Sequence, residues 1–354
     1  MTIIYLYRSL AAFGGVERIF IDKANYLAEH YGYHVYIITW EQGGHSIVYP
    51  LSPKVTHIDW GILFYRQYQY GLFKRMFMQW KMEKEFFKKL SNFVHTTQAD
   101  IVIGASCEFT TMAGMDLLQR KTHTILETHS MRTSIEKNNP PAGNLLMRWA
   151  FKRRDKQLHQ YIKHMSAFVT LTHNDAKDWS DITPQARIIP NMLHRYPAEI
   201  SPDKKTQKRI ITAGRLVEQK GYDLLLDAWS KVHQKHPEWI LDIYGEGEDK
   251  TMLLEKRKNL ALENSVLFHP PTLDIYQKYM DSDFYVMSSR FEGFGLVLAE
   301  AMSCGIPCVS FDCPHGPSDI IKDYEDGLLV EKENIKELAD KICYLIENEN
   351  VRIK

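Results

Sequence analysis

The sequence predicts an α/β fold of two tandem domains, each with a parallel sheet covered by helices on both faces. Short β-branched or aromatic runs alternate with helical stretches, which is typical of repeated strand–helix–strand units. The length of 354 residues exceeds that of one α/β core of ordinary size. A polar stretch with two prolines, Ala198–Lys208, separates two such series and indicates a linker.

The first Rossmann-like domain is expected to span residues 1–190. The N-terminus lacks the basic segment and cleavage site of a signal peptide and predicts a first strand. The expected strands are Ile3–Tyr7, Val35–Thr39, Val55–Ile58, Ile101–Gly104, Thr124–Glu127 and Phe168–Leu171. The expected helices are Glu17–His30, Phe73–Leu90, Phe109–Gln119 and Asn144–His164.

The second Rossmann-like domain is expected to span residues 191–354. Its expected strands are Ile210–Ala213, Leu241–Tyr244, Val266–Phe268, Phe284–Met287 and Cys308–Phe311. Its expected helices are Tyr222–Lys235, Thr251–Leu262, Gly295–Ser303 and Ile335–Glu347. Ligands of such sheets bind beyond the carboxyl ends of the strands, so we expect a ligand crevice between the two domains.

Composition indicates a globular protein rather than a membrane-spanning one. Hydrophobic residues make up 44% and charged residues 25%. No apolar run approaches the roughly 20 residues that cross a bilayer. The five cysteines form no CxxC pair and no histidine follows them at zinc-ligand spacing, so we expect buried thiols and a cytoplasmic protein: Cys107, Cys304, Cys308, Cys313 and Cys343.

Charge is divided unevenly although the formal net charge is zero. Residues 1–190 hold 23 Lys and Arg against 16 Asp and Glu, whereas the remainder holds 21 against 28. A basic first half suggests an anionic partner such as a phosphate-rich lipid surface. Nucleic acid is not expected, because no recognition-helix, zinc-finger or RNP-type pattern is present.

The segment RFEGFGLVLAE at Arg290–Glu300 predicts an anion-binding turn. Glu292 lies at the turn from strand to helix, where Gly293 and Gly295 allow the backbone to approach a ligand closely. Glu300 lies about a turn and a half into the helix, whose N-terminus favours an anion. The alternative is that two acidic residues at a helix start merely balance its dipole.

Two further loops follow predicted strands. In TAGRLVEQKG, Arg215 and Lys220 can grip a diphosphate, although a solvated loop is the alternative. In FGGVER at Phe13–Arg18, the amides of Gly14 and Gly15 can face a phosphate or sugar, although the pair is often only a turn. The latter is not the dinucleotide fingerprint GxGxxG, which disfavours a NAD oxidoreductase.

Together these motifs resemble the retaining GT-B glycosyltransferases of glycosyltransferase family 4, which includes bacterial glycolipid, lipopolysaccharide and capsule enzymes. The matching segments span nearly the whole chain: GGVER, AGRLVEQKG, YGEGED, EGFGLVLAEAMSCGIPCVS and DGLLV. The resemblance implies a fold of two Rossmann-like domains that face each other across a cleft. It also implies that the protein is a hexosyltransferase. The stretch FDCPHGPSDII is similar to the subgroup that uses UDP-linked hexoses or N-acetylhexosamines.

The resemblance also implies roles for the residues of these motifs. Glu292 would contact hydroxyls of the donor sugar, Glu300 the nucleotide ribose, and Arg215 and Lys220 the diphosphate. His129 in LETHS would contact the sugar on its acceptor side, although a capping or core histidine is the alternative. The remaining expected donor contacts are Gly14, Gly15, Gly245, Gly247, Gly293, Phe294, Gly295 and Leu296.

We expect no metal and no other cofactor, because the nucleotide sugar is a substrate and no DxD motif indicates a metal-bridged diphosphate. Arg215 and Lys220 can replace such an ion. The resemblance favours a front-face reaction in which the departing phosphate accepts the acceptor's proton. A covalent intermediate on Glu292 is the older alternative.

Two stretches indicate contact with an anionic membrane on the inner face of the cell. Phe64–Lys89 interleaves aromatics, Met and basic residues, and Leu145–Lys163 contains Lys152-Arg153-Arg154. The alternative is an amphipathic helix that covers the sheet. The implied acceptor is a saccharide or a polyprenyl-linked glycolipid.

Two other functions stay open. A nucleotide-sugar epimerase of the same architecture would need acid and base groups elsewhere, which the paired-glutamate pattern disfavours. The second is a catalytically silent sugar-nucleotide-binding protein, which is favoured where the chain differs from the family pattern at its C-terminal end. The resemblance implies a long final helix that crosses back to the first domain, whereas the chain stops at Asn350–Lys354, as a truncated chain would.

Overall fold

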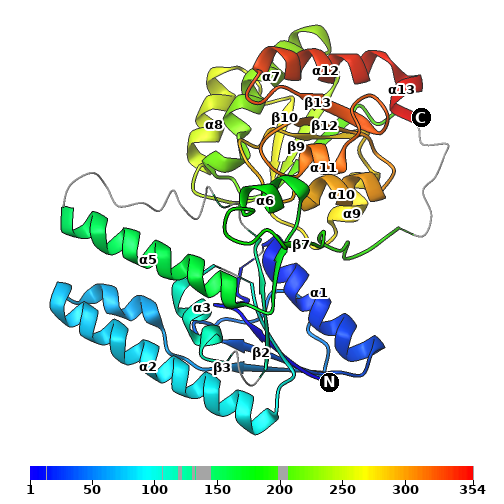
Figure 1. The fold of residues 1–354 in the computed structure, drawn as a ribbon. Helices are drawn as coiled ribbons and strands as arrows, with labels where there is room; N and C mark the ends of the chain where they lie inside the picture. Colours follow the sequence, from blue (N-terminus) through cyan, green and yellow to red (C-terminus); the bar gives the residue numbers. More distant parts are fainter. Residues whose placement is uncertain are drawn as a thin grey trace. The chain divides into compact units, whose positions relative to one another are not determined.

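The computed structural model describes residues 1–12, 14–105, 107–118, 122–129, 132, 145–197 and 206–353, with backbone alone for 145–151. Phe13, Gln119, Asn144 and most of the expected linker therefore lie outside the described residues. The chain divides into two compact units, Met1–Met192 and Leu193–Lys354. Each unit is built on one parallel sheet, with the chain running from blue to red in Figure 1.

The described part of the first unit forms a seven-stranded sheet in the order β3-β2-β1-β4-β5-β6-β7. Ile4 in the central strand pairs with Tyr36 on one side and Val102 on the other. All pairs are parallel, so the carboxyl ends of the strands share one edge. The strands are β1 (Thr2–Leu6), β2 (His34–Thr39), β3 (Val55–Asp59), β4 (Ile101–Gly104), β5 (His123–Glu127), β6 (Ala167–Thr170) and β7 (Arg187–Ile188).

Helices cover both faces of this sheet. The first packs Phe20 and Ala24 into the core of one face, and the second packs Phe86 and Leu90 into the core of the other. They are α1 (Gly15–His30), α2 (Leu72–Thr97), α3 (Phe109–Asp116), α5 (Leu145–His164), α6 (His173–Asp178) and the 3-10 helix η1 (Phe64–Gln69). The second helix ends seven residues after its expected end, because Val94 continues its buried face until Gln98 turns left-handed (φ 48°).

The described part of the second unit forms a six-stranded parallel sheet in the order β10-β9-β8-β11-β12-β13. Its strands are β8 (Arg209–Ala213), β9 (Ile240–Tyr244), β10 (Val266–His269), β11 (Phe284–Met287), β12 (Cys308–Phe311) and β13 (Gly327–Val330). The last of these was not expected from the sequence. The loops that follow β8, β9, β11 and β12 leave the sheet at one edge, because these strands are neighbours and run the same way.

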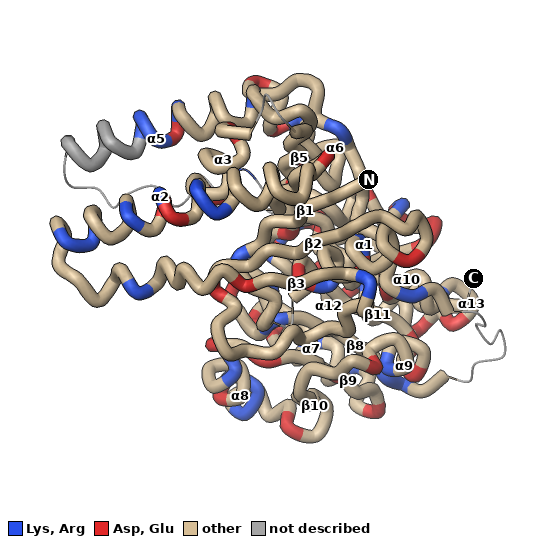
Figure 2. The backbone as a smooth tube through the Cα atoms, turned by 90° about the horizontal axis from the view of Figure 1, so that it is seen from below, with Lys and Arg blue, Asp and Glu red and all other residues tan. Residues whose placement is uncertain are grey.

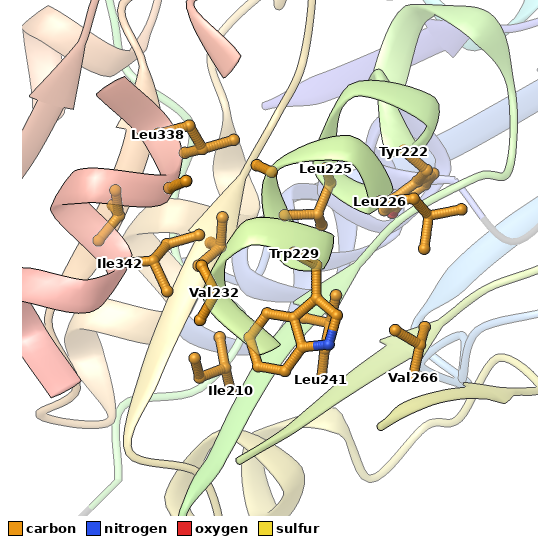
Figure 3. Close-up of a cluster of buried hydrophobic side chains, with 14 of the residues drawn as sticks. Ile210, Tyr222, Leu225, Leu226, Trp229, Val232, Leu241, Val266, Leu338 and Ile342 are labelled. Carbon is orange, nitrogen blue, oxygen red and sulfur yellow. The ribbon is translucent and has the colours of Figure 1, made fainter. Parts of the chain in front are cut away.

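The core of the second unit is densely apolar. Trp229 lies beside the sheet residues Ile210 and Leu241, in the same buried cluster as the helix residue Ile342 (Figure 3). Its ring nitrogen donates to Ser265 Oγ at 3.2 Å. The helices are η2 (Glu218–Lys220), α7 (Tyr222–Lys235), α8 (Lys250–Asn259), α9 (Ile275–Met280), α10 (Leu296–Ser303), α11 (Pro317–Ile320), α12 (Ile335–Glu347) and α13 (Glu349–Ile353).

The expected end of a helix in the second unit is also wrong. Helix α8 was expected to continue to Leu262 but ends at Asn259. Ala261 adopts a left-handed backbone (φ 54°), which turns the chain so that the Leu262 amide donates to the Arg257 carbonyl at 3.0 Å. Among the described residues, no helix combines the length and apolar character that crossing a bilayer requires.

Candidate functional site

Loops after four neighbouring strands are joined at the carboxyl edge of the second sheet. A loop follows each of the strands β8, β9, β11 and β12, and backbone hydrogen bonds join the loops of neighbouring strands. The amides of Gly214, Leu216, Arg290 and Glu292 donate to the carbonyls of Tyr244 (3.0 Å), Glu246 (2.9 Å), Gln219 (2.8 Å) and Pro314 (3.5 Å). Segments up to 100 residues apart in the chain therefore form one continuous surface of loops, called the loop edge below.

Glycines are required where these loops approach. A Cβ on Gly245 would lie 1.9 Å from the Gly214 carbonyl oxygen, and one on Gly247 would lie 2.2 Å from that of Leu216. Gly221 has φ +61° and a Cβ there would lie 2.1 Å from the Ser288 oxygen. The close packing of the loops is therefore enough to require glycine at positions 245 and 247, whether or not a ligand binds there.

Lys220 and Glu292 meet within the loop edge. Lys220 Nζ lies 2.6 Å from Glu292 Oε1, and the two side chains are only 16% and 8% exposed. The same oxygen accepts a hydrogen bond from Ser289 Oγ at 2.6 Å. The structure thus joins the two charged residues that the sequence motifs named separately, and it adds Ser289, which sequence reasoning missed. The only available signal was a Ser-Ser pair directly after strand β11.

The two arginines of these loops differ in their surroundings. Arg290 forms a bidentate pair with Asp223, at 2.8 and 2.7 Å. Burial raises the pKa of Asp223, but the hydrogen bonds and charge of Arg290 outweigh it and hold that pKa below its ordinary value. Arg215 is exposed, and no ion pair engages it among residues 206–353. Arg215 therefore offers a guanidinium to a ligand, whereas Arg290 fastens the loop to α7.

Glu300 lies on the helix that follows the Glu292 loop. Gly295 is the N-cap of α10 and has φ +84°, so the backbone conformation there favours glycine. Glu300 is the fifth residue of α10 and is buried, and its Oε2 accepts from the Tyr279 hydroxyl at 3.5 Å. Gly293, Phe294 and Leu296 lie in the same turn. The expected carboxylates therefore stand on one strand–loop–helix segment, one in the loop and one in the helix.

The first unit places its predicted residues at the carboxyl edge of its own sheet. Gly14 is the N-cap of α1 and Gly15 its first residue. His129 follows β5 by two residues, its side chain is only 3% exposed, and its Nε2 lies 3.4 Å from Glu127 Oε2. That carboxylate oxygen also binds Lys23 Nζ at 2.8 Å. Sequence reasoning missed Glu127 and Lys23, which are 104 residues apart.

The Glu127 carboxylate orients the histidine ring. Burial raises the pKa of Glu127, but the His129 hydrogen bond and the Lys23 charge hold it below its ordinary value. A charged carboxylate at Nε2 favours the tautomer that carries the proton there. His129 Nδ1 is buried and has no hydrogen-bond partner within the described part of the chain. Its hydrogen-bonding capacity is therefore unused within the described residues.

The chain is similar to known glycosyltransferases. Residues 198–354 match the family model described as glycosyl transferases group 1. The chain is 29% identical to an uncharacterized glycosyltransferase of Haemophilus influenzae, over 97% of this chain and 90% of that protein. It is 39% identical to the amylovoran biosynthesis glycosyltransferase AmsD of Erwinia amylovora, over 46% of this chain but only 44% of that protein.

A solved structure shows the same fold. TarM of S. aureus, in a complex with fondaparinux, alpha-GlcNAc-glycerol and UDP, superposes with a TM-score of 0.74. The match covers 99% of this chain and 93% of TarM at 16% identity, so it establishes the fold alone. The chain has the GT-B fold, and its residues 198–354 match a glycosyltransferase family.

The five cysteines form no disulfide bond. Four of them are buried. Burial, together with the charge of Glu292, raises the pKa of the Cys313 thiol to about 12, so this neighbour of the loop edge is a neutral thiol at ordinary pH. Among the described residues, no group of three or more His, Cys, Asp or Glu is placed to hold a metal ion.

Proposed function

We propose that this protein is a glycosyltransferase that moves a hexose or N-acetylhexosamine from a UDP-linked donor to a saccharide or polyprenyl-linked saccharide, with retention at the anomeric carbon. The pairing of Lys220 with Glu292 in the loop edge, beside the exposed Arg215, carries the proposal. A cation at this place can bind a diphosphate, and the neighbouring carboxylate can accept hydrogen bonds from a sugar. The role in surface polysaccharide synthesis draws support from the name of AmsD, and the UDP donor from the complex of TarM.

When the donor binds at the loop edge, Lys220 would exchange Glu292 for the diphosphate as its partner. The diphosphate would take up Lys220 and Arg215, and Glu292 would then be free to accept hydrogen bonds from sugar hydroxyls. Glu300 would bind the ribose, and the amides of Gly293, Phe294, Gly295 and Leu296 would meet the phosphate or sugar. As the C1–O bond to the diphosphate breaks, charge grows on the β-phosphate. Cations held there in advance stabilise the transition state most.

The first unit would supply the acceptor side. His129 Nδ1, which carries the lone pair in the tautomer set by Glu127, would accept a hydrogen bond from a sugar hydroxyl. Gly14 and Gly15 would bring the N-terminus of α1 to the phosphate. In the front-face reaction the acceptor oxygen bonds to C1 as the departing phosphate oxygen takes its proton. Retention then requires no covalent bond to Glu292, whose pairing with Lys220 and Ser289 supports a binding role.

A metal ion is not part of the proposal. Lys220 and Arg215 bring two positive charges to one loop, which is what a divalent cation would contribute to a diphosphate. We place the reaction at the inner face of the cell membrane, where a polyprenyl-linked acceptor is found.

A screen of UDP- and GDP-sugars tests the function. Each compound would be added to the protein, and both thermal unfolding and donor hydrolysis would be measured. A bound donor at about 100 times its Kd stabilises the protein by about 2.7 kcal/mol. We expect one UDP-sugar to raise the melting temperature most and to be hydrolysed slowly without acceptor. Conversion of a donor to its epimer would favour the epimerase, and binding without hydrolysis or transfer would favour a silent binding protein.

A further inference from the structure

The first turns of α2 expose large apolar side chains. Leu72, Phe73, Met76, Phe77 and Trp80 are 56 to 88% exposed, and Phe73 is the most exposed. Large side chains of this kind normally lie in the core or in a binding surface. In α2, the buried residues begin only at Met82. The first ten residues of the helix therefore present an apolar surface, called the α2 apolar face below, that no described residue of the chain covers.

The five residues form one face of the helix. At 100° per residue they lie within an arc of about 140° around the helix axis. Met82 and Phe86 lie outside this arc, whereas Leu90 and Val94 fall within it toward one edge, and all four pack into the first unit. The apolar surface at the start of the helix thus partly continues its core-facing side, and it is exposed because buried residues begin only at Met82.

Basic residues border the α2 apolar face. Between Phe64 and Lys89 the chain has seven Lys or Arg and two Glu. The cations lie over aromatic rings: Lys74 over Tyr70 at 4.2 Å, Arg75 over Tyr68 at 4.1 Å and Lys84 over Trp80 at 5.2 Å. Aromatic and apolar side chains beside Lys and Arg are the pattern of helices that lie in the headgroup region of an anionic bilayer.

Helix α5 extends this basic surface. Figures 1 and 2 both show α5 and α2 projecting on the same side of the first unit. Lys152, Arg153, Arg154 and Lys156 are exposed on α5. Lys and Arg are visible along both helices in Figure 2. A partner that meets both helices at once therefore has to be anionic and broad.

We infer that α2 binds an anionic membrane, with Phe73, Phe77 and Trp80 entering the headgroup region and the neighbouring lysines contacting lipid phosphates. A second copy of the chain is a poorer partner, because the same surface on the copy would bring basic residues against basic residues. The inference does not depend on the loop edge. Membrane binding at α2 would bring the first unit to a lipid-linked acceptor.

Vesicle flotation without any sugar tests the inference. The full chain is expected to float with equimolar phosphatidylcholine and phosphatidylglycerol, to float poorly with phosphatidylcholine alone, and to dissociate at high salt. The triple variant Phe73→Ser, Phe77→Ser, Trp80→Ser should lose binding by at least tenfold. The matched control Met252→Ser, Leu273→Ser removes exposed apolar residues of the second unit and should bind as the parent does.

Charge variants and fluorescence complete the test. Lys74→Gln, Lys81→Gln and Lys84→Gln should each weaken vesicle binding roughly fivefold. The exposed lysines Lys258, Lys322 and Lys332, changed to Gln, serve as controls. Brominated lipids should quench tryptophan emission in the parent and quench it less in Trp80→Phe.

Three results would overturn the inference, provided thermal unfolding shows that the variants are folded. They are no flotation at low salt, flotation that survives the triple serine variant, and a dimer of the parent that the triple variant abolishes. Donor hydrolysis is measured separately, so a failure of the proposed function would not affect the outcome.

Discussion

Lys220 and Glu292 neutralise each other in a place where few water molecules reach. Removing two charges from water is unfavourable, and their attraction repays this only when further hydrogen bonds complete the site. Ser289 Oγ provides one such bond to Glu292. Loss of either charge would leave the other buried and uncompensated. Burial of the pair therefore contributes little to the stability of the fold, which agrees with a role in ligand binding.

Replacing Lys220 with Met should reduce both stability and activity. The buried carboxylate of Glu292 loses its partner, so the free energy of unfolding should fall by about 3 kcal/mol. Loss of a cation at the departing phosphate should lower kcat/KM for the donor by about 10²–10³-fold. Lys256→Met is the control, because Lys256 pairs with Asp227 at 2.7 Å in a more exposed pair. Chemical denaturation and donor kinetics measure the two effects, and equal losses in both variants would contradict the role of Lys220.

Glu127→Gln should change the acid dependence of stability. The pKa of Glu127 is held below its ordinary value in the folded chain, so its charge stabilises the fold above that ordinary value, 4.5. This stabilisation is lost as pH falls through the lowered folded pKa. The variant should thus be less stable than the parent at pH 7, and the difference should shrink below pH 4.5. Urea unfolding at several pH values measures this; parallel curves for the two proteins would count against it.

Individual residues could be predicted from motifs, but their partners could not. Lys220 and Glu292 each stand in a glycine-flanked loop after a strand, which marked them in the sequence. They meet because β8 and β11 are neighbours in the sheet, and neither motif predicts the order of the strands. Lys23 and Glu127 had no motif. A carboxylate at the end of a buried strand was the only sign of Glu127.

At the scale of elements, the loop edge depends on close backbone contacts. Gly245→Ala would place a Cβ 1.9 Å from the Gly214 carbonyl oxygen, so the loops after β8 and β9 must move apart. We expect a loss of about 1–3 kcal/mol in the free energy of unfolding and weaker donor binding. Gly44→Ala is the control, since nothing lies within 4 Å of its Cβ position. Thermal unfolding and donor titration measure the effects, and an unchanged affinity for the donor would separate this loop from the site.

Long periodic elements were predicted well and short ones were missed. Helices α7 and α12 have the expected bounds, because a steady apolar periodicity marks them. Strand β13 has four residues and helix α9 six, too few for a period to show. The expected end of α2 at Leu90 was wrong because polar residues interrupt its pattern there, although the buried face continues to Val94.

At the scale of the whole molecule, charge and sites divide between the two units. The loop edge with Lys220 and Glu292 belongs to the second unit, whereas His129 and the α2 apolar face belong to the first. This division agrees with the proposal that the second unit binds the donor and the first unit the acceptor. The excess of Lys and Arg in residues 1–190 agrees with an anionic surface as the partner of the first unit.

Chelation of metal ions should leave transfer intact. If Lys220 and Arg215 supply the charge that the diphosphate needs, EDTA at millimolar concentration should change the transfer rate by less than about twofold. The rate would be measured with a radiolabelled UDP-sugar, before and after added Mg²⁺ or Mn²⁺. Complete loss in EDTA and recovery with one ion would show that the two cations are insufficient.

Titration calorimetry with UDP and UMP tests the central claim most directly. If the loop edge grips a diphosphate, UDP should bind at least tenfold more tightly than UMP to the parent. Lys220→Met and Arg215→Met should remove most of that difference, whereas Lys256→Met should preserve it. Equal affinities of UDP and UMP, or a preference for UDP that survives loss of both cations, would contradict the account.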